Sequence, residues 1–408
     1  MKIGERNEKK FDLIIWGATG YTGKLVCEHI FKNYKNTTLK WALGGRDKTK
    51  IKSLISSLNL TSIPYLIADS NNKNSLLDMT KMTKTICSTV GPYAKYGTLL
   101  VEACIESKTN YCDITGETQW IRKIIDKFHA KAVESKVKII NACGFDSIPS
   151  DLGVFYAQNN MKENIGKYAS KIYMRVITLK GGVSGGTIHS FLNILKHSRK
   201  NKNNLKIVKN PHGLSPGVDF FESDETDLKK IIYDKTCKEW IGPFVMASIN
   251  TRIVRRSNYL IDYKYGKDFI YNEASIVGKS IFSKFLGYFK LLPIYLISSV
   301  KNKTFNKLVR LIMPKPGKGP TERSRKNGYF KLSFYVFDKK LKAVVFVSGT
   351  GCPGYGSTSK MLAESSICLA IDKLPNKSGI LTPSTGLGAP LLSRLEQNAD
   401  LKFEFKQV

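Results

Sequence analysis

A glycine-rich turn near the start of the chain constrains the fold more than any other feature. It reads Gly17-Ala18-Thr19-Gly20-Tyr21-Thr22-Gly23, between an apolar run at residues 11–18 and a helical pattern at residues 24–31. Glycines at this spacing permit a tight turn, let the backbone approach a pyrophosphate, and let the helix pack against the strand. The spacing GxxGxxG, in a strand-turn-helix setting, therefore predicts dinucleotide binding, in a variant that we associate with NADP-dependent reductases.

Residues 11–150 alternate between apolar runs and helical patterns. The runs are apolar on both faces, as in a parallel sheet that helices cover on two sides. We expect strands at 11–18, 39–45, 63–68, 85–90, 110–114 and 137–142, with helices at 24–31, 48–58, 98–107 and 118–135. The predicted fold class is α/β, with an N-terminal Rossmann domain, built on a doubly wound parallel sheet, at residues 1–150.

The pattern changes after residue 151. Short runs predict strands at residues 171–179, 259–265, 269–276, 329–337 and 343–348. We expect antiparallel hairpins to join the second of these strands to the third, and the fourth to the fifth. A second, α+β domain with a mixed or antiparallel sheet is thus predicted at residues 151–378, for the substrate or for dimerisation. Residues 379–408 are expected to pack back on the Rossmann domain.

Further cofactor contacts are expected where the next strands end. Arg46 stands where an NAD enzyme places an acidic residue for the ribose 2′-OH, so it favours NADP over NAD by pairing with a 2′-phosphate. Alternatively, Arg46 is only a solvated charge at the end of a strand. Asp69 either reaches the adenine or serves only its turn. The stretch Val90-Gly91-Pro92 either walls the nicotinamide side of the cleft or forms a plain turn into the next helix.

Three side chains are candidates for catalysis. Tyr93 is a phenol beside the expected nicotinamide, with ordinary wall packing as its alternative. Asp146 and Ser147 follow the sixth strand, where they position substrate, relay a proton, or merely cap the next helix. His189 follows a glycine-rich run and is either a cleft residue or a structural histidine. No Ser/His/Asp triad and no metal-ligand spacing stands out, so no metal site is predicted.

Composition narrows the class of protein. The chain has 408 residues and a net charge of +32, but lysine outnumbers arginine 53 to 12, which is typical of an AT-rich genome. No nucleic-acid-binding module is recognisable, so no nucleic-acid partner is predicted. The eight cysteines form no CxxC pair, and residues 1–10 lack the apolar region of a secretory signal. These features predict reduced thiols in a cytoplasmic protein.

The positive charge is concentrated beside the most apolar stretch. Residues 281–331 contain twelve Lys or Arg and a single acid, and residues 281–300 are apolar except for two lysines, Pro293 and small polar groups. An apolar face beside a cationic one is typical of a helix lying in a membrane interface. We therefore predict peripheral membrane association through residues 281–312. Buried helices of the second domain are one alternative, and a transmembrane span, which the two lysines disfavour, is another.

Short motifs follow one another through nearly the whole chain. They are GATGYTG at 17–23, GGR at 44–46, VGPY at 90–93, YCDITGE at 111–117, CGFDSIPSD at 143–151, GGVSGGT at 181–187, PKPGKGP at 314–320, PGY at 353–355 and GILTP at 379–383. This ordered set resembles the saccharopine dehydrogenase-like oxidoreductases. Lys318 and Cys352 depart from the family pattern, because we expect acidic residues at both positions.

The resemblance implies an NADP(H)-dependent oxidoreductase. Family members are similar to bacterial trans-acting enoyl reductases that act on lipid or polyketide chains, and animal members are associated with lipid droplets. With the basic apolar segment, this predicts action on a lipid-like small molecule at a membrane or lipid-droplet surface, and we also consider a homodimer. The alternatives are a soluble saccharopine or amino-acid dehydrogenase and a non-catalytic nucleotide-binding protein on a lipid surface.

Overall fold

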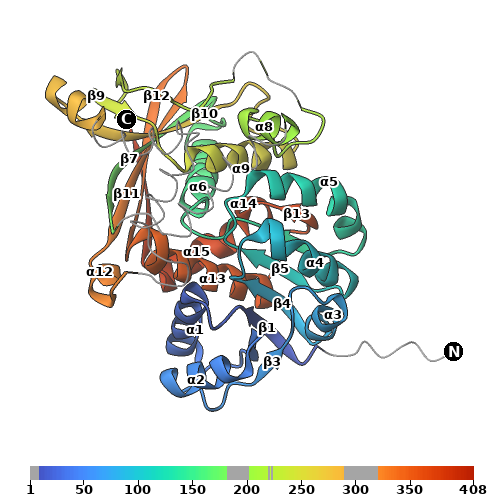
Figure 1. The fold of residues 1–408 in the computed structure, drawn as a ribbon. Coiled ribbons are helices and arrows are strands. Elements are labelled where there is room, and N and C mark those ends of the chain that lie inside the picture. The colour runs from blue at the N-terminus through green and yellow to red at the C-terminus, as the bar shows by residue number, and fades with distance from the viewer. Residues whose placement is uncertain (1–8, 182–201, 219–220, 222–223, 289–319) are drawn as a thin grey trace. The chain divides into compact units, whose positions relative to one another are not determined.

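The computed structural model describes residues 9–181, 202–218, 221, 224–288 and 320–408 (Figure 1). The chain divides into two compact units, each assembled from segments that are far apart in the sequence. The first unit comprises Met1–Thr115, Lys123–Gly144 and Ser359–Ala399, and the second comprises Gly116–Arg122, Phe145–Thr358 and Asp400–Val408. The candidate residue His189 and most of the basic apolar segment, residues 289–312, lie outside the described residues.

A seven-stranded sheet, sheet A, forms the centre of the first unit. Its order is β13-β6-β5-β4-β1-β2-β3, and every strand pair in it is parallel. This is the strand order of a doubly wound nucleotide-binding fold with one added strand, so the predicted Rossmann sheet is confirmed. The strands are β1 (Phe11–Trp16), β2 (Trp41–Gly45), β3 (Tyr65–Ile67), β4 (Thr83–Ser88), β5 (Asn110–Asp113), β6 (Lys138–Ile140) and β13 (Gly379–Leu381).

Helices cover both faces of sheet A (Figure 1). One face carries α1, α13 and α15, which meet at the fully buried carboxylate of Glu364: Tyr34 donates to it at 2.7 Å, and His29 and Arg394 lie 2.8 and 3.5 Å away. The other face carries α3 and α4, which pack against each other. The helices are α1 (Tyr21–Tyr34), α2 (Lys48–Leu58), α3 (Lys73–Lys81), α4 (Tyr93–Glu106), α5 (Thr118–Glu134), α13 (Thr358–Ile371), α14 (Pro383–Gly386) and α15 (Gly388–Asn398).

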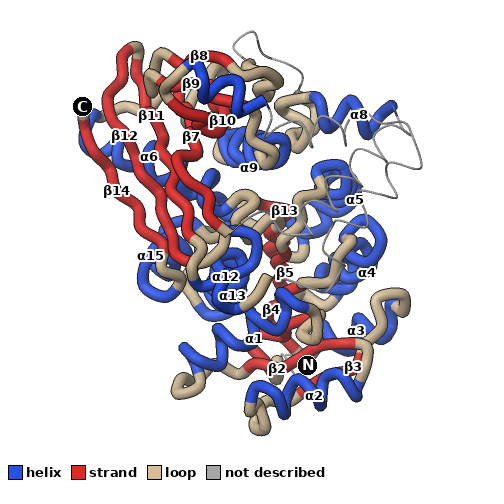
Figure 2. Tube along the Cα trace, turned by 60° about the vertical axis from the view of Figure 1, so that its left-hand side comes forward, coloured by secondary structure: helices blue, strands red, loops and turns tan. Residues whose placement is uncertain are grey.

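A second seven-stranded sheet, sheet B, organises the second unit. Its order is β14-β12-β11-β7-β10-β9-β8; β10 and β7 are parallel and the other pairs antiparallel, so the predicted mixed sheet is confirmed. The long helices α6 and α9 contact each other and the strands of this sheet (Figure 2). The elements are α6 (Ile148–Ile165), β7 (Lys171–Lys180), α8 (Lys202–Lys209), β8 (Ile232–Asp234), β9 (Glu239–Gly242), α9 (Ala247–Leu260), β10 (Ile270–Gly278), α12 (Glu322–Lys326), β11 (Tyr329–Asp338), β12 (Lys340–Thr350), a short π-helix (Pro353–Ser357) and β14 (Leu401–Gln407).

One predicted hairpin is correct and one is wrong. β11 and β12 pair across the expected turn. The strand expected at residues 259–265 does not exist, because α9 extends to Leu260 and a turn follows in which Asp262 and Tyr263 have positive φ. Asn258 holds that turn, since its side chain accepts from the Tyr265 N–H at 3.1 Å and donates to the Gly266 carbonyl at 2.8 Å. The alternating aromatic residues resemble a strand pattern, but Tyr259 packs edge-on against Tyr263, and Tyr265 packs edge-on against Phe269.

The C-terminal segment divides between the two units, whereas residues 379–408 were expected to pack on the first. β13 extends sheet A beside β6. β14 instead pairs antiparallel with β12 and forms the edge of sheet B, with Leu401 and Phe403 buried. Alternating apolar residues are satisfied by any sheet with an open edge, so the pattern alone does not choose between sheets. In the described parts of the chain, no helix is long and apolar enough to cross a membrane.

Candidate cofactor and active site

The predicted glycine turn lies directly between β1 and α1, and its geometry requires glycine. Gly17 has a φ of +85°, and a Cβ added there would lie 2.6 Å from Val90 Cγ2. A Cβ on Gly23 would overlap the Gly17 carbonyl oxygen, so the first turn of α1 packs against the loop as only glycine allows. Helix α1 starts after Gly20 without a side-chain cap and without an acid in its first turn. This cradle fits a dinucleotide pyrophosphate, which would take the uncapped N–H groups.

The end of β4 closes the other side of the turn. Thr89 Oγ1 donates to the carbonyl oxygens of Trp16 and Gly17 at 3.1 and 3.0 Å. These bonds tie β4 to the glycine turn and place Val90 against Gly17. The Gly91–Pro92 peptide that follows is cis and leads into α4. The structure thus brings the predicted wall residues Val90, Gly91 and Pro92 to the same sheet edge as the turn.

Arg46 and Asp69 follow the ends of β2 and β3 at this edge. Arg46 is exposed and has no hydrogen-bond or ion-pair partner among the described residues, so its guanidinium is available to a 2′-phosphate. Its neighbour Asp47 is the N-cap of α2 and accepts from the Lys50 N–H at 3.0 Å. Asp69 is already engaged, because its Oδ1 accepts from the Asn71 N–H at 2.9 Å. Its own turn therefore accounts for Asp69 without a cofactor contact.

Tyr93 opens α4 as a buried wall residue. Its side chain is 6% exposed, and its hydroxyl donates to the Ser88 carbonyl at 3.1 Å. This bond uses the phenol hydrogen inside the protein, at the end of β4. The local geometry favours the packing role over the predicted role as a proton donor.

Asp113, the last residue of β5, organises the neighbouring strand ends. Its carboxylate accepts from Tyr111 Oη and Asn141 Nδ2, both at 2.9 Å, and from the N–H groups of Thr115 and Ala142 at 3.0 and 3.2 Å. Burial raises the pKa of this carboxyl to about 6, although these hydrogen bonds lower it. Asp113 therefore holds the loops after β5 and β6 in place. The sequence signal that could have identified this role is an aspartate at the end of a buried strand.

Asp146 and Ser147 lie in the turn that leads into α6 of the second unit. Asp146 has no hydrogen-bond or ion-pair partner in the described chain, and loss of hydration raises the pKa of its carboxyl to about 7. Ser147 is fully buried and occupies the N-cap position of α6, but it makes no capping bond. Its hydroxyl donates instead to Asn250 Oδ1 at 3.1 Å. Helix capping, the alternative considered for both residues, therefore does not explain Ser147.

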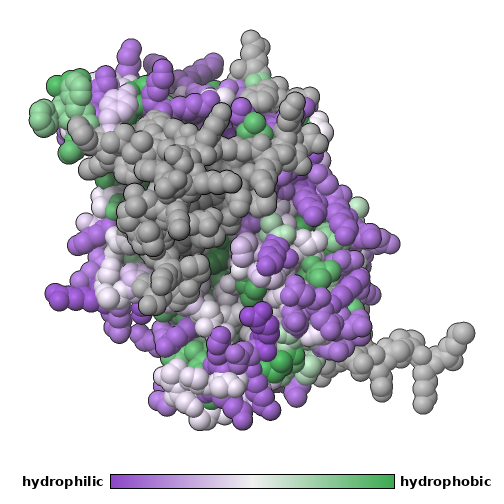
Figure 3. Space-filling model, viewed as in Figure 1, coloured by the Kyte–Doolittle hydropathy of each residue, from purple (hydrophilic) through white to green (hydrophobic). Residues whose placement is uncertain are grey.

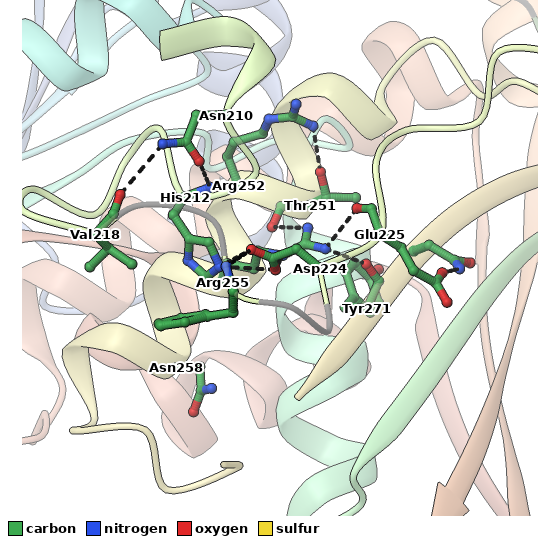
Figure 4. Close-up of polar contacts among 12 residues, drawn as sticks. Asn210, His212, Val218, Asp224, Glu225, Thr251, Arg252, Arg255, Asn258 and Tyr271 are labelled. Carbon is green, nitrogen blue, oxygen red and sulfur yellow. Dashed lines mark hydrogen bonds and ion pairs between the residues drawn. The ribbon is translucent and has the colours of Figure 1, made fainter. Parts of the chain in front are cut away.

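A buried arginine cluster on α9 was missed by sequence reasoning. Arg252, Arg255 and Arg256 are each at most 3% exposed. Arg255 Nε lies 3.5 Å from Asp224, whose carboxylate also meets His212 Nε2 at 3.0 Å, and Figure 4 shows these side chains pointing toward one another. Burial raises the pKa of Asp224, but its partners outweigh burial and hold it below the usual value. The sequence signal that could have identified this cluster is three arginines within five residues, because elsewhere in this chain the basic residues are mostly lysines.

Comparison with known proteins places this geometry in a family. Residues 13–140 match the model of the saccharopine dehydrogenase NADP-binding domain. A putative trans-acting enoyl reductase from Mycobacterium tuberculosis is 33% identical over 95% of this chain and 96% of its own length. A trans-acting enoyl reductase from Mycobacterium ulcerans is 31% identical over 96% of both chains. The chain belongs to the saccharopine dehydrogenase-like oxidoreductases.

The fold of this oxidoreductase also matches a solved relative. A saccharopine dehydrogenase from Saccharomyces cerevisiae superimposes with a TM-score of 0.51 over 97% of this chain and 99% of the other, at 12% sequence identity. At that identity the match concerns the fold alone. The family, the α/β fold, the class of NAD(P)-dependent oxidoreductase and the cofactor NADP are confirmed. The individual cofactor contacts and catalytic roles stay predictions.

Proposed function

We propose that this oxidoreductase is an NADPH-dependent enoyl reductase that acts on a lipid-like acyl substrate. The observation that carries the proposal is the match of almost the entire chain, 95%, to relatives named trans-acting enoyl reductases. Both the cofactor domain and the second unit are included in that match. NADPH supplies the hydride, which adds to the β carbon of the enoyl group, and a proton adds to the α carbon.

The residues of this chain have distinct tasks in the proposed reaction. The turn around Gly17 and Gly23 receives the pyrophosphate, and Arg46 pairs with the 2′-phosphate. Asp146 is the proposed proton donor, because a carboxyl with a pKa of about 7 and no partner in the described chain is half protonated at neutral pH and free to exchange its proton.

The direct test uses the full chain, NADPH and the coenzyme A thioester of trans-2-decenoic acid. We expect oxidation of NADPH with formation of the decanoyl thioester, and [4-²H]NADPH of the correct face should place one deuterium on the β carbon. Asp146→Asn should lower the rate constant by about 100-fold, the lower range for a general acid, without changing NADPH affinity. NADPH binding without turnover of any enoyl thioester would favour the non-catalytic alternative, and saccharopine-dependent NAD(P) reduction would favour the amino-acid dehydrogenase.

We propose in addition that the enzyme works at a lipid surface. Residues 281–288 are helical and carry an exposed apolar group on the second unit: Ile281, Phe282, Phe285 and Leu286 are 58%, 79%, 61% and 52% exposed. In Figure 3 apolar side chains gather at this end of the unit, at the upper left. Lys284 stands among them, with Nζ 4.5 Å from the Trp240 ring centroid. Apolar side chains beside a cation match an anionic membrane interface.

Vesicle flotation tests this second proposal. The full chain should float with vesicles of phosphatidylcholine and phosphatidylserine. The double variant Phe282→Glu with Phe285→Glu should reduce the floated fraction by about tenfold, since it loses two aromatic side chains that would insert into the lipid. Val133→Glu is the matched control, because Val133 is 44% exposed on a different helix, α5. Equal flotation of the double variant would exclude these residues as the contact, and binding to neutral lipid droplets but not to vesicles would exclude an anionic membrane.

A further inference from the structure

The helix at residues 281–288 packs on the second unit with the reverse of the usual arrangement. A helix at a protein surface normally buries an apolar stripe and exposes a polar one. Here the buried residue is Gly287, and a Cβ added to it would lie 2.6 Å from Val277 Cγ1 and 2.8 Å from Ile231 Cδ1. One turn earlier, Ser283 is partly buried. The exposed residues are large and apolar: Ile281, Phe282, Phe285 and Leu286. Small and polar side chains therefore attach this helix to its unit, and its apolar stripe faces outward.

The β8–β9 hairpin continues this apolar surface. Tyr233 of β8 stands opposite Trp240 of β9, and their rings pack edge-on with centroids 5.5 Å apart. Lys284 of the helix places Nζ 4.5 Å from the centroid of the Trp240 ring, so the helix and the hairpin lie side by side (Figure 1). We call the combined area the helix–hairpin surface, and it comprises Tyr233, Trp240, Ile281, Phe282, Phe285 and Leu286.

Only one face of the hairpin belongs to this surface. Side chains alternate between the two faces of a strand, so Tyr233 lies on the same face as Ile231, which contacts the helix. Ile232 and Asp234 point to the opposite face, where Asp234 accepts from Arg175 Nε at 2.6 Å. Tyr233 and Ile232 are 48% and 46% exposed. Two neighbours on one strand, almost equally exposed, thus belong to different faces.

The charges around the helix–hairpin surface favour an anionic partner. Residues 229–240 contain four lysines and two acids, and residues 279–288 contain two lysines and no acid. One of the two acids, Asp234, is already paired with Arg175. A second copy of this chain would bring the same lysines against these, whereas anionic headgroups would neutralise them. Tyrosine and tryptophan beside large apolar side chains are typical of the boundary between headgroups and acyl chains.

We propose that the β8–β9 hairpin is a second lipid-contact element beside the helix. Tyr233 and Trp240 lie at the headgroup level of an anionic phospholipid bilayer, while Phe282 and Phe285 insert toward the acyl chains. The inference rests on the proposed lipid-surface function and deepens it, because it assigns the face of the second unit that meets the bilayer. Contact through both the helix and the hairpin holds this unit in one orientation, with Ile232 left in water.

The first test uses the fluorescence of Trp240. The other three tryptophans, Trp16, Trp41 and Trp120, are buried in the protein, whereas Trp240 is partly exposed. We expect vesicles of phosphatidylserine and brominated phosphatidylcholine to quench part of the emission of the full chain. Bromine near the headgroup end of the acyl chain should quench more than bromine near the chain terminus. Trp240→Phe should remove this loss of emission.

The quenching result separates the two lipid proposals. Flotation with vesicles but no quenching of Trp240 overturns the hairpin contact and leaves the lipid-surface function standing. Equal binding to vesicles of phosphatidylcholine alone overturns the choice of an anionic partner. Absence of both flotation and quenching overturns both proposals.

The second test compares two neighbouring substitutions on β8. Tyr233→Glu should lower the vesicle partition coefficient by about tenfold, since an interfacial aromatic is lost and an acid is placed among anionic headgroups. Ile232→Glu is the matched control, because it adds the same charge at the same exposure on the other face, and it should change partitioning by less than about twofold. NADPH binding by both variants checks that they are folded. Equal effects of the two substitutions overturn the inference. A dimer in sedimentation that Tyr233→Glu dissociates, without flotation of the wild type, would assign the surface to a second copy and likewise overturn it.

Discussion

The cofactor edge of the first unit and the interior of the second are built from different material. The first consists largely of backbone: a contiguous turn whose Gly17 and Gly23 leave no room for a Cβ. The second consists of buried charged and polar side chains, Arg255, Asp224 and His212 among them, contributed by distant segments. A site that is formed by the backbone of one contiguous segment can be recognised in the sequence as a motif. A side-chain-built site depends on partners that only folding brings together.

The largest expected effect lies in the second unit. Asp224→Ala would leave Arg255 and His212 buried without their shared carboxylate, at a cost of about 3–5 kcal/mol in the free energy of unfolding. Chemical denaturation followed by tryptophan fluorescence measures it, with Asp78→Ala, at an exposed residue of α3, as the control. A loss no larger than that of the control would mean that the cluster is not held by its charges.

Substitution in the glycine turn should lower stability less than Asp224→Ala does, but it should weaken NADPH binding strongly. Gly17→Val introduces a β-branched residue at positive φ against Val90, a strain of about 1–3 kcal/mol. We expect NADPH affinity to fall by at least about tenfold, which isothermal calorimetry measures, while the second unit stays folded by circular dichroism. Gly166→Ala is the control, because Gly166 has positive φ but an open environment. Equal NADPH affinity in Gly17→Val would contradict the assigned cradle.

Asp113, which is buried, and Asp146, which is partly buried, should differ in how substitution changes stability, because only Asp113 is hydrogen-bonded within the described chain. The raised pKa values of Asp113, about 6, and Asp146, about 7, mean that the folded state binds protons more tightly than the unfolded state. Stability is thus fully present below about pH 4 and is lost as pH rises through 6 to 7, by at most about 1.4 kcal/mol per pH unit for each group. Asp146→Asn should flatten the slope and stabilise at pH 8. Asp113→Asn should flatten it but destabilise, because its four donors lose an acceptor. Thermal unfolding of both variants, measured across this pH range, tests these two expectations.

Arg46 tests the cofactor edge through specificity. Arg46→Gln should weaken NADPH binding by about tenfold and leave NADH binding unchanged, as expected for one exposed charged contact. Lys48→Gln, at the start of α2, is a neighbouring exposed control. Equal losses of affinity for NADPH and NADH would mean that Arg46 does not contact the 2′-phosphate.

The smallest effect is expected at Cys352, where the family pattern led us to expect an acid. Its sulfur accepts from the Gly356 N–H at 3.2 Å and so occupies the cap position of the short π-helix. Cys352→Asp should therefore be tolerated within about 1 kcal/mol, because a carboxylate is a better cap. Cys368→Asp, at another buried thiol without that role, should be far more destabilising. If both substitutions cost the same, the sulfur is not acting as a cap.

The elements of the first unit could largely be predicted from the sequence. For the second unit only the fold class, an α+β domain with a mixed sheet, could be predicted. The strands of sheet A and helix α2 follow from continuous apolar runs and helical spacing, which are local patterns, although β1 pairs with β4 and β6 with β13 across long stretches of chain. The false strand at 259–265 and the division of residues 379–408 arose because alternating apolar residues do not specify which partner they meet. Tyr93 shows the same limit at the site, since its bond to Ser88 is a tertiary detail.

The sequence was enough to predict the Rossmann sheet and the glycine turn, because both depend on backbone conformation and local spacing; the preference for NADP came from the Arg46 side chain. Tertiary structure alone decided the roles inside the second unit. Ser147 could be a cap, a donor or an acceptor, and its position against Asn250, 103 residues away in the chain, selected among these. Hydrogen-bond direction depends on the partner that is met, and that partner exists only once α6 and α9 have packed together.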